Sequence, residues 1–182
     1  MRLNMEQLKM LRDNTMVEEF NFPEGFFMRS YNKGDELGWC RCMINGDLGV
    51  EEIKEEVFEE KMLKDKSVNP NNIFFLISSE NEIVGTVTYQ YTNDKAIGFI
   101  HMVGIDPRYR GRKLALPMHL YVIKKMLEDS VEQIFLTTDD WRLPAIKVYL
   151  NAGFKPVFYQ PDMEGRWNQV MAKLRMKNST GV

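Results

Sequence analysis

Three apolar runs separated by short polar turns constrain the fold of this chain more than any other feature. The runs are Ile73 to Ser78, Ile83 to Tyr91 and Ile97 to Ile105, and they are rich in β-branched and aromatic residues. The turns between them are Glu80-Asn81-Glu82 and Asn93-Asp94-Lys95. Because turns this short join antiparallel neighbours, the segment is predicted to form a three-stranded meander.

The flanking sequence predicts helices mixed with further strands. After the meander, helices are expected at Leu114 to Glu128 and from Pro144 to Gly153, and strands at Gln133 to Thr138, Phe154 to Tyr159 and Asn168 to Leu174. Before it, a weak helical pattern (Met1, Met5, Leu8, Leu11) precedes a strand at Gly25 to Tyr31, a marginal helix from Asp35 to Ile44 and a clearer helix at Val50 to Leu63. The order predicts an α/β protein with a mixed, mostly antiparallel central sheet flanked by helices.

Composition bounds the domain count and the partners. The 182 residues show no repeat and no linker, so residues 1–182 are expected to form a single domain. Lys and Arg number 24 against 26 Asp and Glu, and this net charge of −2 offers no broad basic field for nucleic acid or an anionic membrane. No apolar stretch approaches the roughly 18 residues that span a bilayer, so a soluble, cytoplasmic protein is expected.

A structural metal site is not expected. The chain has two cysteines, Cys40 and Cys42, and two histidines, His101 and His119, and they are too few and too scattered for the usual four-ligand Cys/His site. Both cysteines are expected to be reduced.

The meander leads into a basic loop before a long helix. The loop carries Arg108, Arg110, Arg112 and Lys113. A helix N-terminus presents unpaired backbone N–H groups and about half a positive charge, so a loop of this kind is suited to a pyrophosphate. The alternative from charge alone is a solvated basic turn.

Two sequence motifs, which follow one another in the chain, favour a ligand site over a solvated turn. Val103 to Ala115 resembles the coenzyme A signature of the GNAT (Gcn5-related) N-acetyltransferase superfamily, with Arg110 at its first position and Ala115 at its last. Lys113 stands where the middle glycine is usual, and that glycine lets the backbone approach the phosphates closely. Pro144 to Phe154 resembles the later helix of the same family, with a tyrosine, Tyr149, followed after three residues by Gly-Phe.

The resemblance implies an acyl-CoA-binding core at residues 73–174, with residues 1–70 supplying acceptor-side helices and the first strand. Main-chain groups around Val103 and Ile105 would bind the pantetheine arm, and the loop from Arg110 to Leu116 would bind the pyrophosphate. A bulge would splay the fourth strand from the next. The cofactor-binding residues so implied are Val103, Gly104, Ile105, Arg110, Gly111, Arg112, Lys113, Leu114, Ala115 and Leu116.

The resemblance also implies catalytic roles. Tyr149 would be the general acid for the departing thiolate, although its helix also allows a plain core tyrosine. His101 is expected to be the general base, because alternation places it on the same side of its strand as Ile105; a structural histidine is the alternative. Asp139 and Asp140 are rival bases, and many relatives have no essential base.

These features predict an enzyme that moves the acetyl group of acetyl-CoA to a primary amine of a small molecule, peptide or protein. A catalytically silent acyl-CoA sensor is the alternative, supported by Lys113 and by Arg142, which occupies the place of a common asparagine. A nucleic-acid-binding domain is disfavoured because the basic run is short and no stacking platform accompanies it. The acceptor and the oligomeric state, a homodimer included, are left open.

Overall fold

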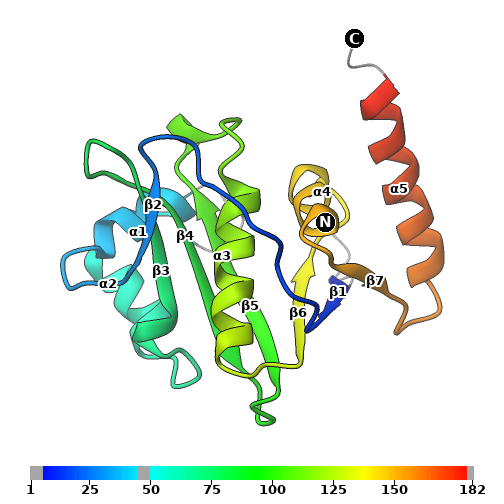
Figure 1. Ribbon diagram of the computed structural model, residues 1–182, viewed down its shortest axis with the longest axis horizontal. Helices are drawn as coiled ribbons and strands as arrows, with labels where there is room; N and C mark the ends of the chain where they lie inside the picture. The colour runs from blue at the N-terminus through cyan, green and yellow to red at the C-terminus, as the bar shows by residue number, and fades with distance from the viewer. Residues whose placement is uncertain (1–5, 45–49, 180–182) are drawn as a thin grey trace.

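The computed structural model describes residues 6–44 and 50–179, which build one seven-stranded sheet with helices on both faces (Figure 1). The strands are β1 (Leu8–Asp13), β2 (Phe27–Ser30), β3 (Ile73–Ile77), β4 (Ile83–Tyr91), β5 (Ile97–Ile105), β6 (Gln133–Thr138) and β7 (Lys155–Val157). The helices are α1 (Glu36–Met43), α2 (Glu55–Phe58), α3 (Ala115–Glu128), α4 (Leu143–Asn151) and α5 (Met163–Ser179), with short π or 3-10 turns at Glu59–Leu63, Pro70–Asn72 and Pro107–Tyr109. The strand order is β2-β3-β4-β5-β6-β1-β7.

The predicted meander is confirmed. Strands β3, β4 and β5 pair antiparallel in sequence, and β2 adds antiparallel to the free edge of β3. β5 and β6 run parallel, joined by α3 as the crossover. The mixed, mostly antiparallel sheet expected from the sequence is therefore present.

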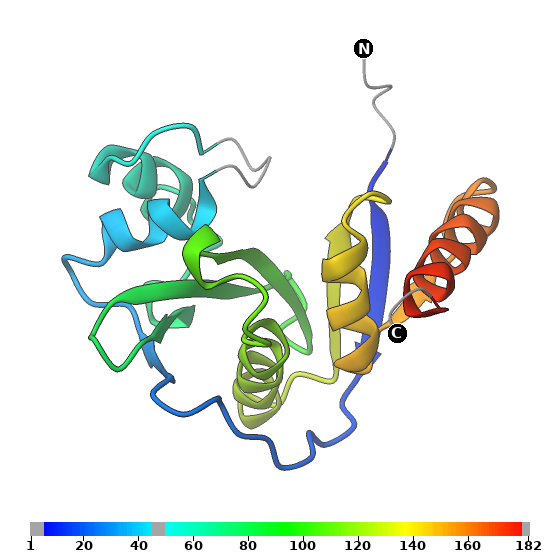
Figure 2. The ribbon, with the colours of Figure 1, turned by 90° about the horizontal axis from the view of Figure 1, so that it is seen from above.

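Two apolar clusters hold helices on opposite faces of the sheet. On one face, Trp39 of α1 and Phe58 of α2 pack on Phe75 of β3. On the other face, α3, α4 and α5 bury one large cluster with the sheet, centred on residues such as Met118 and Tyr149. Figure 2 shows α1 and α2 on one side of the central strands and α3 on the other. Both faces of the central strands are thereby covered.

The expected helix near the N-terminus is wrong. Met1 and Met5 lie outside the described residues, and Leu8 to Asp13 forms strand β1, which pairs antiparallel with β6 on one side and β7 on the other. The strand buries Leu8, Met10 and Arg12 at a spacing of two residues. The chain then passes α3 in a long arc to reach β2 (Figure 2), with Phe22 against the ring of Tyr121.

Two further predictions need correction. Asn168 to Leu174 is not a strand, because it lies within helix α5, which buries Met163, Trp167, Val170 and Leu174 at helical spacing. The helix expected at Val50 to Leu63 begins at Glu55 and ends in a π turn. The other expected elements are present within a few residues of their predicted ends.

A bulge interrupts β5 where the site is built. Thr86 pairs with Gly104 and Thr88 pairs with His101, so two residues of β5 stand opposite the single residue Val87. One of them, Met102, has a φ of 51°, a left-handed value that is uncommon outside glycine. The family resemblance implied such a bulge, and on this side of Phe99 β5 no longer pairs with β6.

Candidate active site

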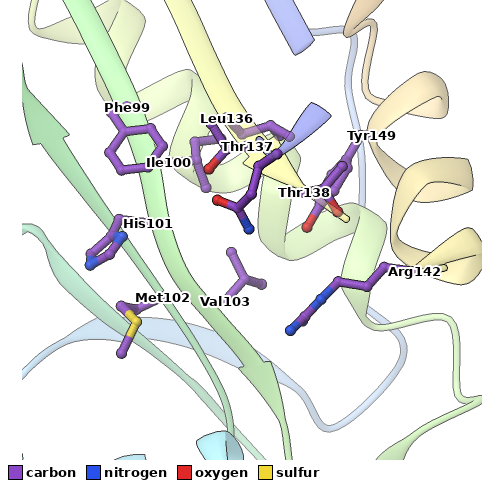
Figure 3. A pocket seen from close by; sticks show the side chains of 11 residues that line it. Phe99, Ile100, His101, Met102, Val103, Leu136, Thr137, Thr138, Arg142 and Tyr149 are labelled. Atoms are coloured by element: carbon purple, nitrogen blue, oxygen red, sulfur yellow. The ribbon is translucent and has the colours of Figure 1, made fainter. Parts of the chain in front are cut away.

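A slot opens between β5 and β6. The two strands pair only from Ile97 to Phe99 of β5, whereas β6 continues to Thr138 and is paired with β1, on its other side, along its whole length. A pocket of about 230 Å³ lies at the opening and is bordered by His101, Arg142 and Tyr149 among others. Figure 3 shows Arg142 extending across the slot toward Val103 of β5. The diverging strands thus leave room for a ligand inside the sheet.

A larger cleft of about 730 Å³ adjoins this pocket. Its walls come from the end of β5, from the loop and first turn of α3, and from one face of α4. The cleft and the slot pocket share Val103, Arg142 and Tyr149 in their linings. A molecule that fills the cleft can therefore present one end to the slot.

Most residues expected to bind the cofactor line this cleft. They are Val103, Gly104, Ile105, Arg110, Gly111, Lys113, Leu114 and Ala115. Arg112 and Leu116 do not line it; the Arg112 guanidinium lies 4.6 Å from the centre of the Tyr109 ring. Arg108 is also directed elsewhere, since it pairs with Asp106 at 2.9 Å. Of the four cations of the basic loop, Arg110 and Lys113 remain at the cleft.

The loop before α3 has two left-handed residues. Gly111 has a φ of 79° and Lys113 a φ of 60°. Glycine adopts this conformation without cost, whereas a side chain such as that of Lys113 is strained by roughly 1–2 kcal/mol. A glycine, which the resemblance gives at the position of Lys113, would adopt this φ without strain. No side chain caps the N-terminus of α3, so its first amides remain available to an anion.

The floor of the cleft needs a glycine at position 104. A Cβ built on Gly104 would lie 2.5 Å from the carbonyl oxygen of Cys42 and 2.6 Å from the sulfur of Met43. The end of α1 therefore packs directly on the backbone of β5 next to the bulge.

Tyr149 is buried in α4 at the junction of the two cavities. Its side chain makes edge-to-face contacts with the rings of His119 and Phe154, and burial raises its pKa to about 12. The phenol therefore keeps its proton throughout the neutral range. Arg12 of β1 anchors the end of the same helix, because its Nε donates to the carbonyl of Ala152 at 3.1 Å. The prediction of Tyr149 as an acid is compatible with this placement.

His101 also borders the slot pocket, but the expected alternation along β5 is wrong. Because of the bulge, His101 shares a face of the sheet with Gly104, and Ile105 points to the opposite face, toward α3. Burial lowers the pKa of His101, and the charge of Asp65 opposes this shift. A neutral imidazole at neutral pH is suited to accept a proton.

The rival bases have other partners. Asp139 accepts a hydrogen bond from Arg142 at 3.1 Å and one from Gln7 at 3.2 Å. Asp140 pairs with Arg166 of α5, and this hydrogen bond lowers the pKa of Asp140. Neither carboxylate lines the slot pocket. The structure thus brings His101, and not these aspartates, to the slot.

The sequence did not single out two polar groups of this region. His119 of α3 and Thr138 of β6 are both 2% exposed, and each carries a side-chain atom without a hydrogen-bond partner among the described residues. A histidine among the apolar residues of a helix was the available signal for the first. Cys40 and Cys42 are free and buried. Among residues 6–44 and 50–179, no cluster of three His, Cys, Asp or Glu side chains suited to a metal ion is found. None of the helices described is long and apolar enough to cross a bilayer.

Comparison with known proteins places this geometry in a family. The acetyltransferase (GNAT) family profile matches residues 47–154, which is more than half of the chain. The chain belongs to the GNAT acetyltransferase family. Solved structures share its fold: a GCN5-related N-acetyltransferase from Sphaerobacter thermophilus is similar with a TM-score of 0.65 and 22% identity, over 82% of this chain and 48% of that one. The NatC complex bound to Gag peptide and CoA is similar with a TM-score of 0.59 and 18% identity, over 76% of this chain and 92% of that one.

Curated relatives within the family are distant. A mycothiol acetyltransferase from Thermomonospora curvata is 22% identical over 157 residues, which are 84% of this chain and 52% of the relative. One from Thermobispora bispora is 25% identical over 144 residues, 72% of this chain and 47% of the relative. N-alpha-acetyltransferase 30 from Dictyostelium discoideum is 27% identical over 82 residues, 44% of each chain. This GNAT chain thus spans about half the length of the mycothiol acetyltransferases that it matches.

Proposed function

We propose that this GNAT protein is a cytoplasmic N-acetyltransferase that moves the acetyl group of acetyl-CoA to a primary amine. The observation that carries the proposal is the junction at Tyr149, where a cleft of about 730 Å³ meets a pocket of about 230 Å³. A donor in the cleft would bring its reactive end to Tyr149, and an amine would reach the same point through the slot. Two cavities that share a proton donor suit a reaction of two substrates.

The residues of the cleft fit the donor. The uncapped N-terminus of α3 and the cations Arg110 and Lys113 would hold the pyrophosphate. The backbone of β5 from Val103 to Ile105 would accept the pantetheine arm. The carbonyl of Ile105 already accepts a hydrogen bond from Arg110 at 3.1 Å, so it fixes this arginine at the mouth of the cleft.

Acetyl-CoA supplies an activated thioester. In the transfer, the amine nitrogen bonds to the acetyl carbon, the carbon–sulfur bond breaks, and the sulfur takes a proton. Tyr149 holds a proton at the junction and is our candidate donor, since its raised pKa keeps the phenol neutral. His101 would take a proton from the amine, directly or through water, because it borders the slot as a neutral imidazole.

Tyr149→Phe tests this role. We expect kcat to fall about 100-fold or more, which is the range of a lost general acid, while the Kd of CoA is retained. Tyr121→Phe is the matched control, because Tyr121 lies on α3 outside both cavities. A wild-type kcat in Tyr149→Phe would remove the proposed acid.

The alternative is a catalytically silent acyl-CoA sensor. Arg142 extends into the slot, where an acceptor amine would have to pass, and its Nε is held by Asp139 at 3.1 Å (Figure 3). CoA binding without thiol release on any amine would favour this alternative. Some relatives are named mycothiol acetyltransferases and another is named an N-alpha-acetyltransferase. The panel of acceptors should therefore include both small-molecule amines and peptide N-termini.

A further inference from the structure

Arg142 brings a positive charge into the slot. It is the residue before the first turn of α4, and Figure 3 shows its side chain directed across the slot toward Val103. The side chain keeps 20% of its surface exposed, and it lines both the slot pocket and the larger cleft. A ligand in the slot can therefore reach the guanidinium group.

Two neighbours fix the direction of the guanidinium group. Its Nε donates to Asp139 at 3.1 Å, and its carbon lies 4.6 Å from the centre of the Trp141 ring. Asp139 is itself held by Gln7, whose side-chain amide donates to it at 3.2 Å. An arginine carries further N–H donors on its two terminal nitrogens, and this planar fork matches the two oxygens of a carboxylate.

The charge of the slot pocket is one-sided. Among the described residues that line it, Arg142 is the one Lys or Arg, and none is an Asp or a Glu. Asp139 contacts Arg142 from outside this lining. Burial lowers the pKa of His101, which leaves that ring neutral at neutral pH. An acceptor with an additional cationic group would find no carboxylate in this lining, whereas an anionic group would find a charged donor.

The size and position of the slot pocket limit the acceptor further. Its volume of about 230 Å³ lies below the roughly 300–1,000 Å³ of pockets that hold drug-sized ligands. Because Arg142 and Tyr149 both line the cleft as well, a carboxylate bound to Arg142 lies close to the expected place of the thioester. The reacting amine has to reach the same place. The amine and the carboxylate are therefore only a few bonds apart, as they are in an α-amino acid.

We propose that the acceptor is a free α-amino acid whose carboxylate is bound by the guanidinium group of Arg142. This inference rests on the proposed function, because it takes the slot to be the acceptor site of an acetyl-CoA-dependent transferase. The products are an N-acetyl amino acid and CoA. A peptide N-terminus has a neutral amide in place of the carboxylate, so Arg142 would favour free amino acids over peptides.

The test compares L-amino acids with their C-terminal amides, which keep the α-amine and lose the carboxylate. Thiol release from acetyl-CoA gives kcat/KM for both members of each pair. The two amines differ in basicity, and this difference cancels when the acid-to-amide ratio of kcat/KM is compared between two proteins. We expect the ratio to fall about 10- to 100-fold in Arg142→Gln, the worth of hydrogen bonds between charged groups. Arg41→Gln is the matched control, because it removes a positive charge on α1 outside both cavities and should keep the ratio.

Two results would overturn the proposal. One is an unchanged ratio in Arg142→Gln, which includes an equal loss of activity on both members of the pair. The other is thiol release by the wild-type protein only with amines that lack a carboxylate. Absence of acetyl-CoA binding, or binding without thiol release on any amine of the panel, would instead refute the proposed function itself.

A measurement on the wild-type protein keeps the test valid if Arg142→Gln does not fold. N-acetyl amino acids and their C-terminal amides both lack the amine, so the members of a pair differ only in the carboxylate. Calorimetry would measure the Kd of each in the presence of saturating CoA. We expect the N-acetyl amino acid to bind about 10-fold more tightly than its amide, or better. Equal affinities would refute the contact between the carboxylate and Arg142.

Discussion

Substitutions of Lys113 separate two contributions of the basic loop, its backbone conformation and its positive charge. The φ of Lys113 is 60°, and a non-glycine residue in this region is strained by roughly 1–2 kcal/mol. Glycine removes this strain, but it also lowers the free energy of unfolding by about 0.5–1 kcal/mol because the unfolded chain gains conformational freedom. Lys113→Gly should therefore raise the free energy of unfolding by about 0.5–1 kcal/mol, or Tm by about 1–4 °C in a chain of this size.

Lys113→Ala is the matched variant, because it loses the same charge and keeps a Cβ in the left-handed conformation. Urea unfolding should rank Lys113→Gly above Lys113→Ala by about 0.5–1 kcal/mol. Both variants should bind CoA a few fold more weakly than wild type at low salt, since each loses one cation at the phosphate site. The reasoning fails if Lys113→Gly is no more stable than Lys113→Ala, or if neither variant changes the Kd of CoA.

Three further variants test the surroundings of the site. Asp65→Asn should move the acidic limb of the kcat profile to lower pH, because the charge of Asp65 raises the pKa of His101; an unmoved limb would argue against His101 as the base. Gly104→Ala should lower the free energy of unfolding in urea by about 1–3 kcal/mol and weaken CoA binding in calorimetry, since its Cβ would lie 2.5 Å from a carbonyl oxygen. Gly165→Ala is the control, because its Cβ would meet nothing within 4 Å, and it should lower neither the stability nor the affinity for CoA. Arg12→Met should cost about 2 kcal/mol in urea unfolding, because the bond to Ala152 at 3.1 Å is lost, and an unchanged midpoint would contradict its anchoring role.

Local signals were sufficient for the centre of the fold. The meander was predictable because its apolar runs are joined by turns too short for any other connection. The basic loop and the helix that ends in Gly-Phe carry their own motifs. These segments place Tyr149 and most of the cleft residues, and the structure keeps them in the expected elements.

The misassigned segments are those whose structure depends on distant partners. Leu8 to Asp13 buries every second residue, but it is short and lies in a sheet between β6 and β7, which follow it by more than a hundred residues. Residues 168–174 contain enough alternation for a strand, although the spacing of the buried positions from Met163 to Leu174 fits a helix.

The details of the site depend on tertiary geometry as well. The bulge at Met102 shifts the alternation of β5, so the face of His101 could not be derived by counting residues. The directions of Arg108 and Arg112, away from the cleft, follow from their contacts with Asp106 and Tyr109. The unpartnered nitrogen of His119 becomes apparent only once α3 and α4 are packed together.

The central claim, that this GNAT chain binds acetyl-CoA and transfers its acetyl group to an amine, is tested most directly in one sample. Calorimetry would first measure acetyl-CoA binding, and release of free thiol would then be followed with a panel of small amines and peptide N-termini. The account predicts binding followed by thiol release that depends on at least one amine. Absence of acetyl-CoA binding would contradict this account.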